Sequence, residues 1–195
     1  MNFKQTGTMT PFRITTERLE VIAGTLELAQ AEISDRAKFA QLLNARVPDT
    51  WPPEFNDHET MSFFLQRLEE APDQIGWWAW YFVLNSQVKN ERILIGNGGF
   101  KGKPTSDGTV EIGYSVLKEF QNLGYGTEAI QALIDWAFNH AEVQRVIAET
   151  LPELKPSQRL LEKCQFTNIG EGSEAGSIRF ELLRRYSGDG EMGRG

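Results

Sequence analysis

The stretch VEIGYSVLKEFQNLGYGTEAIQALIDWAF, residues 110–138, predicts a strand, a glycine loop and a helix in that order. In its second half, apolar residues recur at helical spacing and form one buried stripe. The stripe consists of Ile130, Leu133, Ile134, Ala137 and Phe138. Thr127 stands where a helix N-cap is expected, and Gly124 and Gly126 come just before it. We therefore expect a strand that turns through glycines into a helix packed on the core.

The glycine loop, residues 121–127, is a candidate anion site. Glycines let a ligand approach the backbone closely, and the free N–H groups of a helix N-terminus attract phosphates. The loop therefore predicts either a phosphate cradle or an ordinary turn before a helix. A Walker motif is excluded because the sequence has no GKS or GKT. Gly124-x-Gly126-x-x-Ala129 fits a Rossmann fingerprint, but residues 118–123 separate it from the strand, so this is the weaker alternative.

Outward from this stretch, the patterns predict one α/β (α+β) domain, with a single mixed, twisted sheet of about seven strands and helices on both faces. The expected strands cover residues 19–22, 77–84, 92–100, 109–117, 145–150, 166–169 and 178–183. The expected helices cover residues 25–43, 60–68, 127–140 and 157–164. Residues 1–12 predict a flexible N-terminal arm, residues 13–186 the domain, and the glycine-rich residues 187–195 a disordered tail.

Composition narrows the class of protein further. The 195 residues carry a net charge of -7, which argues against non-specific nucleic-acid binding. One cysteine and two histidines make an intrachain disulfide impossible and a zinc site improbable on composition, so no metal is expected. No apolar run approaches the roughly 20 residues that span a membrane, and no signal peptide is recognisable. We expect a protein of the cytoplasm.

Three ordered motifs resemble one family. Gln121-Asn122-Leu123-Gly124-Tyr125-Gly126 resembles the R/Q-x-x-G-x-G/A signature of the GCN5-related N-acetyltransferases, the GNAT family. Residues 16–19 (TERL) and 111–114 (EIGY) resemble the first strand and the strand before the signature. Residues 152–166 (PELKPSQRLLEKCQF) resemble the PENxxSxRxLEKxGF stretch of the ribosomal-protein N-terminal acetyltransferase-like branch. The resemblance covers residues 16–184, and it departs at Leu154 and Gln165, where the branch has Asn and Gly.

The resemblance implies a sheet splayed between its fourth and fifth strands, here residues 109–117 and 145–150, with acetyl-CoA entering the gap. It implies that the amides of residues 123–127 hold the pyrophosphate and that the strand before them pairs with the pantetheine arm. The cofactor-binding residues expected from it are Tyr114, Ser115, Val116, Gln121, Asn122, Leu123, Gly124, Tyr125, Gly126 and Thr127.

Acetyl transfer to an amine needs a base, because an alkyl ammonium with a pKa of roughly 10 must lose a proton before it attacks. Glu111 is our candidate, since strand alternation places it opposite Val110 and Ile112, and a charge in a central strand needs a reason. The alternative is a salt-bridged or exposed strand residue. Glu149 and Glu153 are the remaining candidates for the base.

The acid for the leaving sulfur is less evident. The tyrosine that some family members use falls at Leu161, so we expect Ser157 to donate to the sulfur. Ser157 could instead cap the helix that follows it. Cys164 is expected to be a small buried residue, because no histidine stands at an obvious partner position.

For the acceptor side we name Trp51 and Trp78 as substrate-binding residues, because aromatic faces bind cations; packing in the core is the alternative. We thus expect an N-acetyltransferase that transfers acetyl from acetyl-CoA directly to a primary amine, either a small molecule or a peptide N-terminus. The alternative is a non-catalytic acyl-CoA binding or sensing module. No nucleic acid or membrane is expected as a partner, and the chain is expected to be a monomer or homodimer.

Overall fold

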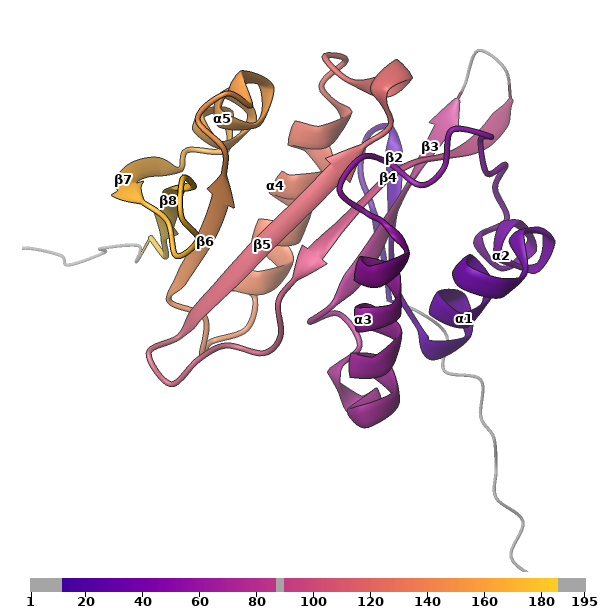
Figure 1. The fold of residues 1–195 in the computed structure, drawn as a ribbon, viewed down its shortest axis with the longest axis horizontal. Helices are drawn as coiled ribbons and strands as arrows, with labels where there is room; N and C mark the ends of the chain where they lie inside the picture. Colours follow the sequence, from indigo (N-terminus) through magenta and orange to yellow (C-terminus); the bar gives the residue numbers. More distant parts are fainter. Residues whose placement is uncertain (1–11, 87–89, 186–195) are drawn as a thin grey trace, which may run out of the picture.

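The structure, a computed structural model, describes residues 12–86 and 90–185. The predicted arm and tail, residues 1–12 and 187–195, therefore lie outside the described residues except for Phe12. Eight strands form one mixed sheet in the order β1-β2-β3-β4-β5-β6-β8-β7 (Figure 1). The strands are β1 (Arg13–Thr15), β2 (Leu19–Ala23), β3 (Ala79–Ser86), β4 (Glu91–Phe100), β5 (Thr109–Val116), β6 (Arg145–Thr150), β7 (Thr167–Glu171) and β8 (Ile178–Leu183). The helices are α1 (Leu26–Ser34), α2 (Arg36–Leu43), α3 (His58–Glu70), α4 (Tyr125–Phe138) and α5 (Lys155–Lys163).

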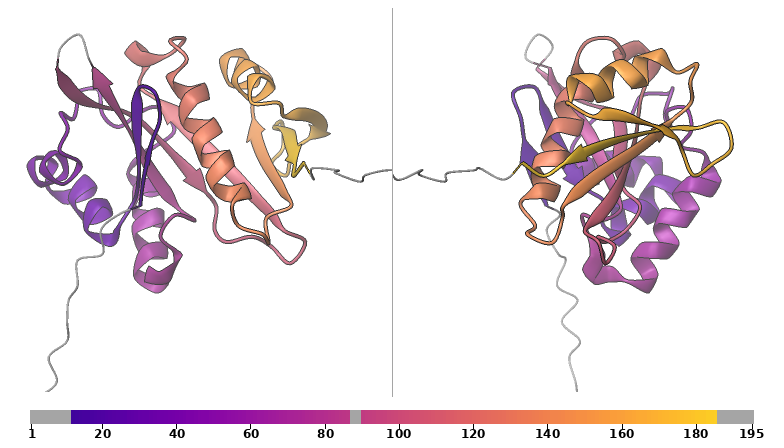
Figure 2. Two further views of the ribbon diagram at one scale, coloured as in Figure 1. Left: turned by 180° about the vertical axis from the view of Figure 1, so that it is seen from behind. Right: turned by 90° about the vertical axis from the view of Figure 1, so that its left-hand side faces the viewer.

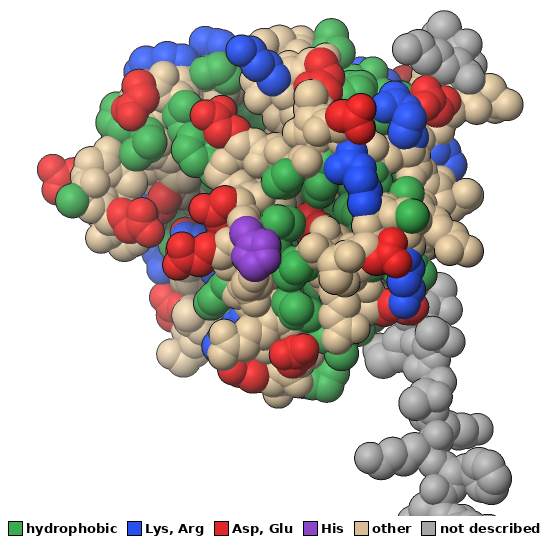
Figure 3. All heavy atoms as spheres, turned by 45° about the vertical axis from the view of Figure 1, so that its right-hand side comes forward, with side chains coloured by type: hydrophobic (Ala, Val, Ile, Leu, Met, Phe, Trp, Pro, Cys, Tyr) green, Lys and Arg blue, Asp and Glu red, His purple; other side chains and the backbone are tan. Residues whose placement is uncertain are grey.

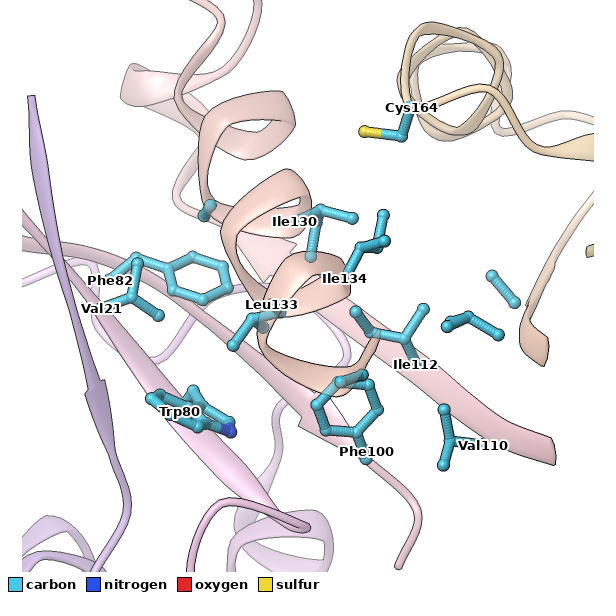
Figure 4. Packing of buried hydrophobic residues seen from close by; sticks show 14 of the residues in the cluster. Val21, Trp80, Phe82, Phe100, Val110, Ile112, Ile130, Leu133, Ile134 and Cys164 are labelled. Carbon is cyan, nitrogen blue, oxygen red and sulfur yellow. The ribbon is translucent and has the colours of Figure 1, made fainter. Parts of the chain in front are cut away.

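Helices cover both faces of the sheet, as predicted (Figure 2). On one face, the apolar stripe of α4 packs on alternate residues of the central strands, among them Phe82, Phe100 and Ile112 (Figure 4). On the other face, α1 and α2 pack on the residues in between, such as Tyr81 and Leu94. The period-2 alternation of the strands thus divides the core into two clusters.

The strands β5 and β6 separate along their length. They pair in parallel only from Thr109 to Glu111, against Arg145–Ile147. Beyond Glu111, β5 pairs only with β4, and β6 continues beside β8. The splay predicted for residues 109–117 and 145–150 is therefore present, between the fifth and sixth strands of the observed eight.

Three element predictions were wrong in detail. The helix predicted over residues 25–43 is two helices, because the Asp35 side chain accepts a hydrogen bond from the Lys38 amide and caps a new helix. Strand β1 was missed because its three residues carry no alternating apolar pattern. Helix α4 begins at Tyr125, so the predicted N-cap Thr127 lies in its first turn. Within residues 12–86 and 90–185, no helix is long and apolar enough to cross a membrane.

Candidate active site

A cavity of about 690 Å³ lies along the splay between β5 and β6. One end is formed by the glycine loop and the N-terminus of α4, and one side is formed by α5. The other end is formed by residues 54–56 and by Thr60 and Phe64 of α3. We call the end at the glycine loop the donor end and the end at residues 54–56 the acceptor end. On the face shown in Figure 3, acidic and basic side chains are interspersed.

The donor end exposes backbone N–H groups. Gly124 is the N-cap of α4 with a φ of 85°, a left-handed conformation that favours glycine. Among the described residues, no side chain caps this helix, whereas Thr25, Asp35 and Asp57 cap α1, α2 and α3. The first amides of α4 are therefore available to an anion, and the helix dipole favours a negative charge there. This arrangement fits the phosphates of coenzyme A.

Most of the predicted loop residues line the cavity, namely Gln121, Asn122, Gly124, Gly126 and Thr127. The side-chain Nε2 of Gln121 donates to the carbonyl of Val116 at 2.8 Å, which fixes the loop to the end of β5. A Cβ on Gly126 would lie 2.8 Å from Cδ1 of Leu160, so this glycine allows α4 and α5 to approach closely. Leu123 and Tyr125 are not among the lining residues.

Arg18, which the sequence did not predict as a site residue, contacts this loop on the side away from the cavity. Its guanidinium donates to the Leu123 carbonyl at 3.0 Å and to Glu128 in the first turn of α4 at 2.7 Å. It also lies over the Tyr125 ring, 4.5 Å from the centroid. Arg18 thus links the turn before β2 to the glycine loop, from outside the cavity.

The edge of β5 offers backbone groups to the gap. The Glu111 carbonyl and the Leu117 amide bond to the β4 side, so the odd-numbered residues of this strand direct their peptide groups toward β4. Tyr114 and Val116 direct theirs toward the gap, where β6 no longer pairs. Ser115 points its peptide groups away from the gap, and its hydroxyl donates to the Glu54 carbonyl at 2.6 Å.

Glu111 forms an ion pair with Lys101, and Lys101 lines the cavity. Glu111 itself is not among the lining residues. The next residue on its face of β5 is Gly113, which does line the cavity, and a Cβ built there meets no atom within 4 Å. Open space therefore lies beside Gly113, on the same strand face as the Glu111 carboxylate.

The alternative bases are placed less favourably. Glu149 lines the cavity but accepts hydrogen bonds from the Ser173 amide at 2.8 Å, from Ser177 Oγ at 2.9 Å and from Arg179 Nη2 at 2.6 Å. Burial alone would raise the pKa of the Glu149 carboxyl, but these hydrogen bonds outweigh it and lower the pKa to about 2. Such a carboxylate is a weak base. Glu153 is exposed and is not among the lining residues.

Ser157 lies in the first turn of α5 and lines the cavity. It does not cap this helix, so that alternative was wrong; Leu154 is the N-cap. The Ser157 hydroxyl lies 3.0 Å from the Tyr114 hydroxyl. Burial raises the pKa of the Tyr114 phenol well above its usual range, which keeps its proton in place.

Two residues of α5 and its C-terminal end belong to the core. Leu161, at the position of the family tyrosine, is fully buried. Cys164 is buried too, as expected, and its Sγ lies 3.8 Å from the Thr127 carbonyl. Burial, and after it the charge of Asp135, raise the pKa of the Cys164 thiol to about 11. A thiol of this kind is a poor nucleophile at neutral pH.

The two tryptophans named for the acceptor do not line the cavity. Trp51 is 8% exposed and packs against Phe39 and Tyr81 in the second core cluster. Trp78 packs edge-on against Phe63 of α3, with ring centroids 6.1 Å apart. Both rings therefore pack against elements of the acceptor end, Trp51 in the core beneath its own segment and Trp78 against α3, and not in the cavity. Within the described part of the chain, no group of three or more His, Cys, Asp or Glu side chains could hold a metal ion.

A gap between two parallel strands, beside a helix N-terminus without a side-chain cap, is a suitable place for a ligand that carries phosphate groups. A model of the acetyltransferase (GNAT) domain matches residues 25–167. The uncharacterized N-acetyltransferase YjdG of Bacillus subtilis (strain 168) is 28% identical over 151 residues, which are 77% of this chain and 87% of that protein. This chain belongs to the GNAT family and is an acetyltransferase.

Solved structures share the fold. The ribosomal-protein-S5-alanine acetyltransferase of Vibrio fischeri superposes with a TM-score of 0.60 at 21% identity, over 88% of this chain and 96% of that one. The microcin C7 self-immunity acetyltransferase MccE, solved with acetyl-CoA and AMP, gives a TM-score of 0.57 at 17% identity, over 87% and 94%. The mixed sheet and its helices are therefore those of a GNAT acetyltransferase, and the neighbours include a ribosomal-protein acetyltransferase.

Proposed function

We propose that this acetyltransferase transfers an acetyl group from acetyl-CoA directly to a primary amine, either a small molecule or a peptide N-terminus. The observation that carries the proposal is the cavity itself. Its donor end presents amides that suit phosphates, and its acceptor end opens on the same space beside Gly113. The family match and the acetyl-CoA in MccE support acetyl-CoA as the donor. Acetyl-CoA supplies the activated thioester; the chain supplies binding, orientation and proton transfer.

For the donor, we propose that the amides at Gly124, Gly126 and Thr127 bind the pyrophosphate, with Gln121, Asn122, Leu123 and Tyr125 shaping the loop. The alternation along β5 favours Tyr114 and Val116 for backbone pairing with the pantetheine arm. Ser115 would act indirectly, because its hydroxyl holds the Glu54 carbonyl. An amide directed into the gap also suits the negative charge that develops on the thioester oxygen.

For proton removal, we propose Glu111 as the general base. The open space beside Gly113 accommodates the acceptor nitrogen or an intervening water, on the strand face that carries Glu111. Lys101, which lines the cavity, forms an ion pair with Glu111 and so connects this carboxylate to the cavity. The low pKa of Glu149 and the exposure of Glu153 favour this choice over the two alternatives.

For the leaving sulfur, we propose that the Ser157 hydroxyl donates a hydrogen bond. Tyr114 orients that hydroxyl through their 3.0 Å contact, and its raised pKa makes it a donor that keeps its own proton. The pair would stabilise the departing thiolate in place of the tyrosine that Leu161 replaces. We further propose the cytoplasm as the location, in keeping with the single buried cysteine, and a monomer or homodimer as the assembly.

Coenzyme A release tests the proposal directly. The purified chain is mixed with acetyl-CoA and a panel of small amines, polyamines and short peptides with free N-termini, and free thiol is measured with a colorimetric reagent. We expect amine-dependent release with at least one class of acceptor, above the rate of thioester hydrolysis. Tight acetyl-CoA binding without release for any amine would instead support the binding or sensing module.

A further inference from the structure

Glu32, on α1, is a carboxylate that the reaction described above does not use. Its side chain is partly buried and accepts three hydrogen bonds from three donors. Tyr81 donates its hydroxyl at 2.6 Å, Trp51 its indole N–H at 3.2 Å and Asn56 its amide at 3.5 Å. Among the described residues, no cation forms an ion pair with Glu32. A carboxylate enclosed by neutral donors without a counter-charge is costly, and its position needs a structural reason.

Two of the three donors belong to one segment. Residues 44–57 join α2 to α3. We call residues 47–57 the wall segment, because Glu54, Phe55 and Asn56 form part of the cavity wall at the acceptor end. Asn56 is buried and lines the cavity, so its side chain joins the cavity to Glu32. On the opposite side, the Glu54 carbonyl is held by Ser115 of β5. The wall segment is thus fixed at one side to the donor strand and at the other to Glu32.

We propose that Glu32 is a positioning residue that holds the wall segment in the shape that receives the acceptor. This inference rests on the proposed function, because that function identifies the end of the cavity that receives the acceptor. The contacts of Glu32 do not depend on it. Trp51, which was expected to touch substrate, acts in this account through Glu32, because its ring packs in the core and its N–H is bound by the carboxylate.

The charge of Glu32 changes near neutral pH. Burial raises the pKa of the carboxyl to about 7, although the hydrogen bonds from Tyr81, Trp51 and Asn56 act in the opposite direction. Among the side chains that face it, Tyr81 is titratable, and burial followed by the charge of Glu32 raises its pKa well above 10. Arg36, the nearest cation along the chain, is engaged with the Pro48 carbonyl and Asp49 instead. Ionised Glu32 has no cation to offset the cost of its burial, so opening of the wall segment, which exposes Glu32 to water, should become easier as pH rises through about 7.

The variant Glu32→Gln imitates the neutral state. Its amide oxygen can accept from Trp51 and Asn56, and its amide N–H can donate to the Tyr81 oxygen. Glu27→Gln is the matched control, because Glu27 lies on the same helix, is paired with Lys38 and does not contact the wall segment. Glu32→Ala removes all three contacts and is informative only if it folds.

The first readout needs no substrate. The indole N–H resonance of Trp51, assigned with Trp51→Phe, is followed across pH 5.5–8.5 together with hydrogen exchange of residues 47–57, corrected for the intrinsic pH dependence. In the wild type and in Glu27→Gln, we expect the resonance to titrate with a midpoint near 7 and the wall segment to exchange faster above it. Glu32→Gln should show neither change. Equal exchange in all three proteins at pH 8.5 would overturn the proposal.

The second readout is kinetic and uses the best amine from the coenzyme A release panel. Above pH 7, we expect the wild type to have a higher KM for the amine than Glu32→Gln, with the KM for acetyl-CoA equal in the two. Glu32→Ala should raise the amine KM by about tenfold, as expected for orphaned donors. A parallel change in both KM values would point to general destabilisation and contradict a positioning role. If no amine is acetylated, the proposed function fails, but the spectroscopic readout still decides the role of Glu32.

Discussion

The donor end and the acceptor end of the cavity are built in different ways. The donor end is a short contiguous stretch, residues 114–127, that presents mainly backbone groups and a helix N-terminus. The acceptor end is formed by residues 54–56 of the wall segment and by Thr60 and Phe64 of α3. Outside the cavity, the wall segment contacts Glu32 of α1, which also accepts a hydrogen bond from Tyr81 of β3. A cofactor common to a family can be bound by backbone alone, whereas the acceptor end depends on side chains that can vary. Substitutions at the two ends should therefore have separable effects on donor binding, acceptor binding and turnover.

The largest effect is expected for Glu111→Gln, which separates proton transfer from donor binding. The substitution keeps the shape but removes the basicity, so turnover at neutral pH should fall by a factor on the order of 10²–10⁴. Acetyl-CoA affinity should stay within error, because backbone groups bind the donor. The difference in turnover between Glu111→Gln and the wild type should become smaller as pH rises toward the pKa of the amine, since solvent then deprotonates the acceptor.

Steady-state kinetics and calorimetric titration with acetyl-CoA check this prediction, and Glu153→Gln is the exposed control. Near-normal turnover with a flat pH response would remove Glu111 from the mechanism. Loss of acetyl-CoA binding would show that Glu111 holds β5 in place, so that the two ends are not separable.

Gly124→Val should break the donor end alone. Valine at a φ of 85° is strained by roughly 1–3 kcal/mol, and its side chain would displace the loop from the anion site. We expect acetyl-CoA affinity to fall by more than about tenfold. Gly126→Val should act similarly, through its clash with Leu160 as well as through any clash with phosphate.

Gly170→Val is the matched control, because Gly170 has a φ of 107° at the sheet edge with open space around it. It should lose comparable stability and keep full acetyl-CoA affinity by calorimetry. If both loop variants are stabilised by acetyl-CoA as strongly as the wild type, the phosphate site lies elsewhere.

Opposite pKa shifts should distinguish Glu32 at the acceptor side from Glu149 on β6. The pKa of Glu32 is raised from 4.5 to about 7, so its stabilising contribution is complete below pH 4.5 and is lost as pH rises through about 7. The pKa of Glu149 is lowered to about 2, so its contribution is present above pH 4.5 and is lost as pH falls toward 2. Glu32→Gln should abolish the first decline, on the order of 2 kcal/mol after allowing for partial exposure.

Urea unfolding of the wild type, Glu32→Gln and Glu149→Gln from pH 2.5 to 8.5 measures both effects. Glu149→Gln should flatten only the acid limb. A Glu32→Gln profile that runs parallel to the wild type between pH 4.5 and 8.5 would mean that Glu32 keeps one charge state throughout.

The smallest effect is expected for Arg18→Met, which loosens the donor loop from behind. Loss of the bonds to the Leu123 carbonyl and Glu128 should weaken acetyl-CoA binding by about threefold to tenfold, equivalent to about 1 kcal/mol for a partly exposed contact. The KM for the amine should not change. Arg13→Met, which removes a surface pair with Glu20, is the control, and an equal loss in both variants would assign the effect to the sheet edge.

The fold was largely predictable because its elements follow local patterns. The stripe from Ile130 to Phe138 predicted α4, and alternating apolar residues predicted seven of the eight strands to within a few residues. Local chemistry also explains the errors. Gly124 is the N-cap in place of Thr127 because the loop enters the helix in a left-handed conformation that favours glycine. Asp35 divides a long helical pattern because its side chain caps a second helix.

The candidate site was predictable only at the donor end. The glycine loop is a single motif, whereas Glu32, Trp51, Asn56 and Tyr81 are brought together across up to 49 positions of sequence. Nothing in the pattern around Glu32 distinguishes it from the other acidic residues of an amphipathic helix. Arg18 had a weak signal within the TERL motif, but its contact with Leu123 spans 105 positions.

The central claim is that the donor binds on the N-terminus of α4 in the gap between β5 and β6. Titration of the 15N-labelled chain with acetyl-CoA, followed by backbone amide shifts, tests it most directly. We predict that the largest shifts fall on Gly124, Gly126 and Thr127 and on Tyr114 and Val116 of β5, while the amide of Gly170 stays unchanged. Largest shifts in the surface groove between β1 and the outer face of α4, with the loop unperturbed, would contradict the account.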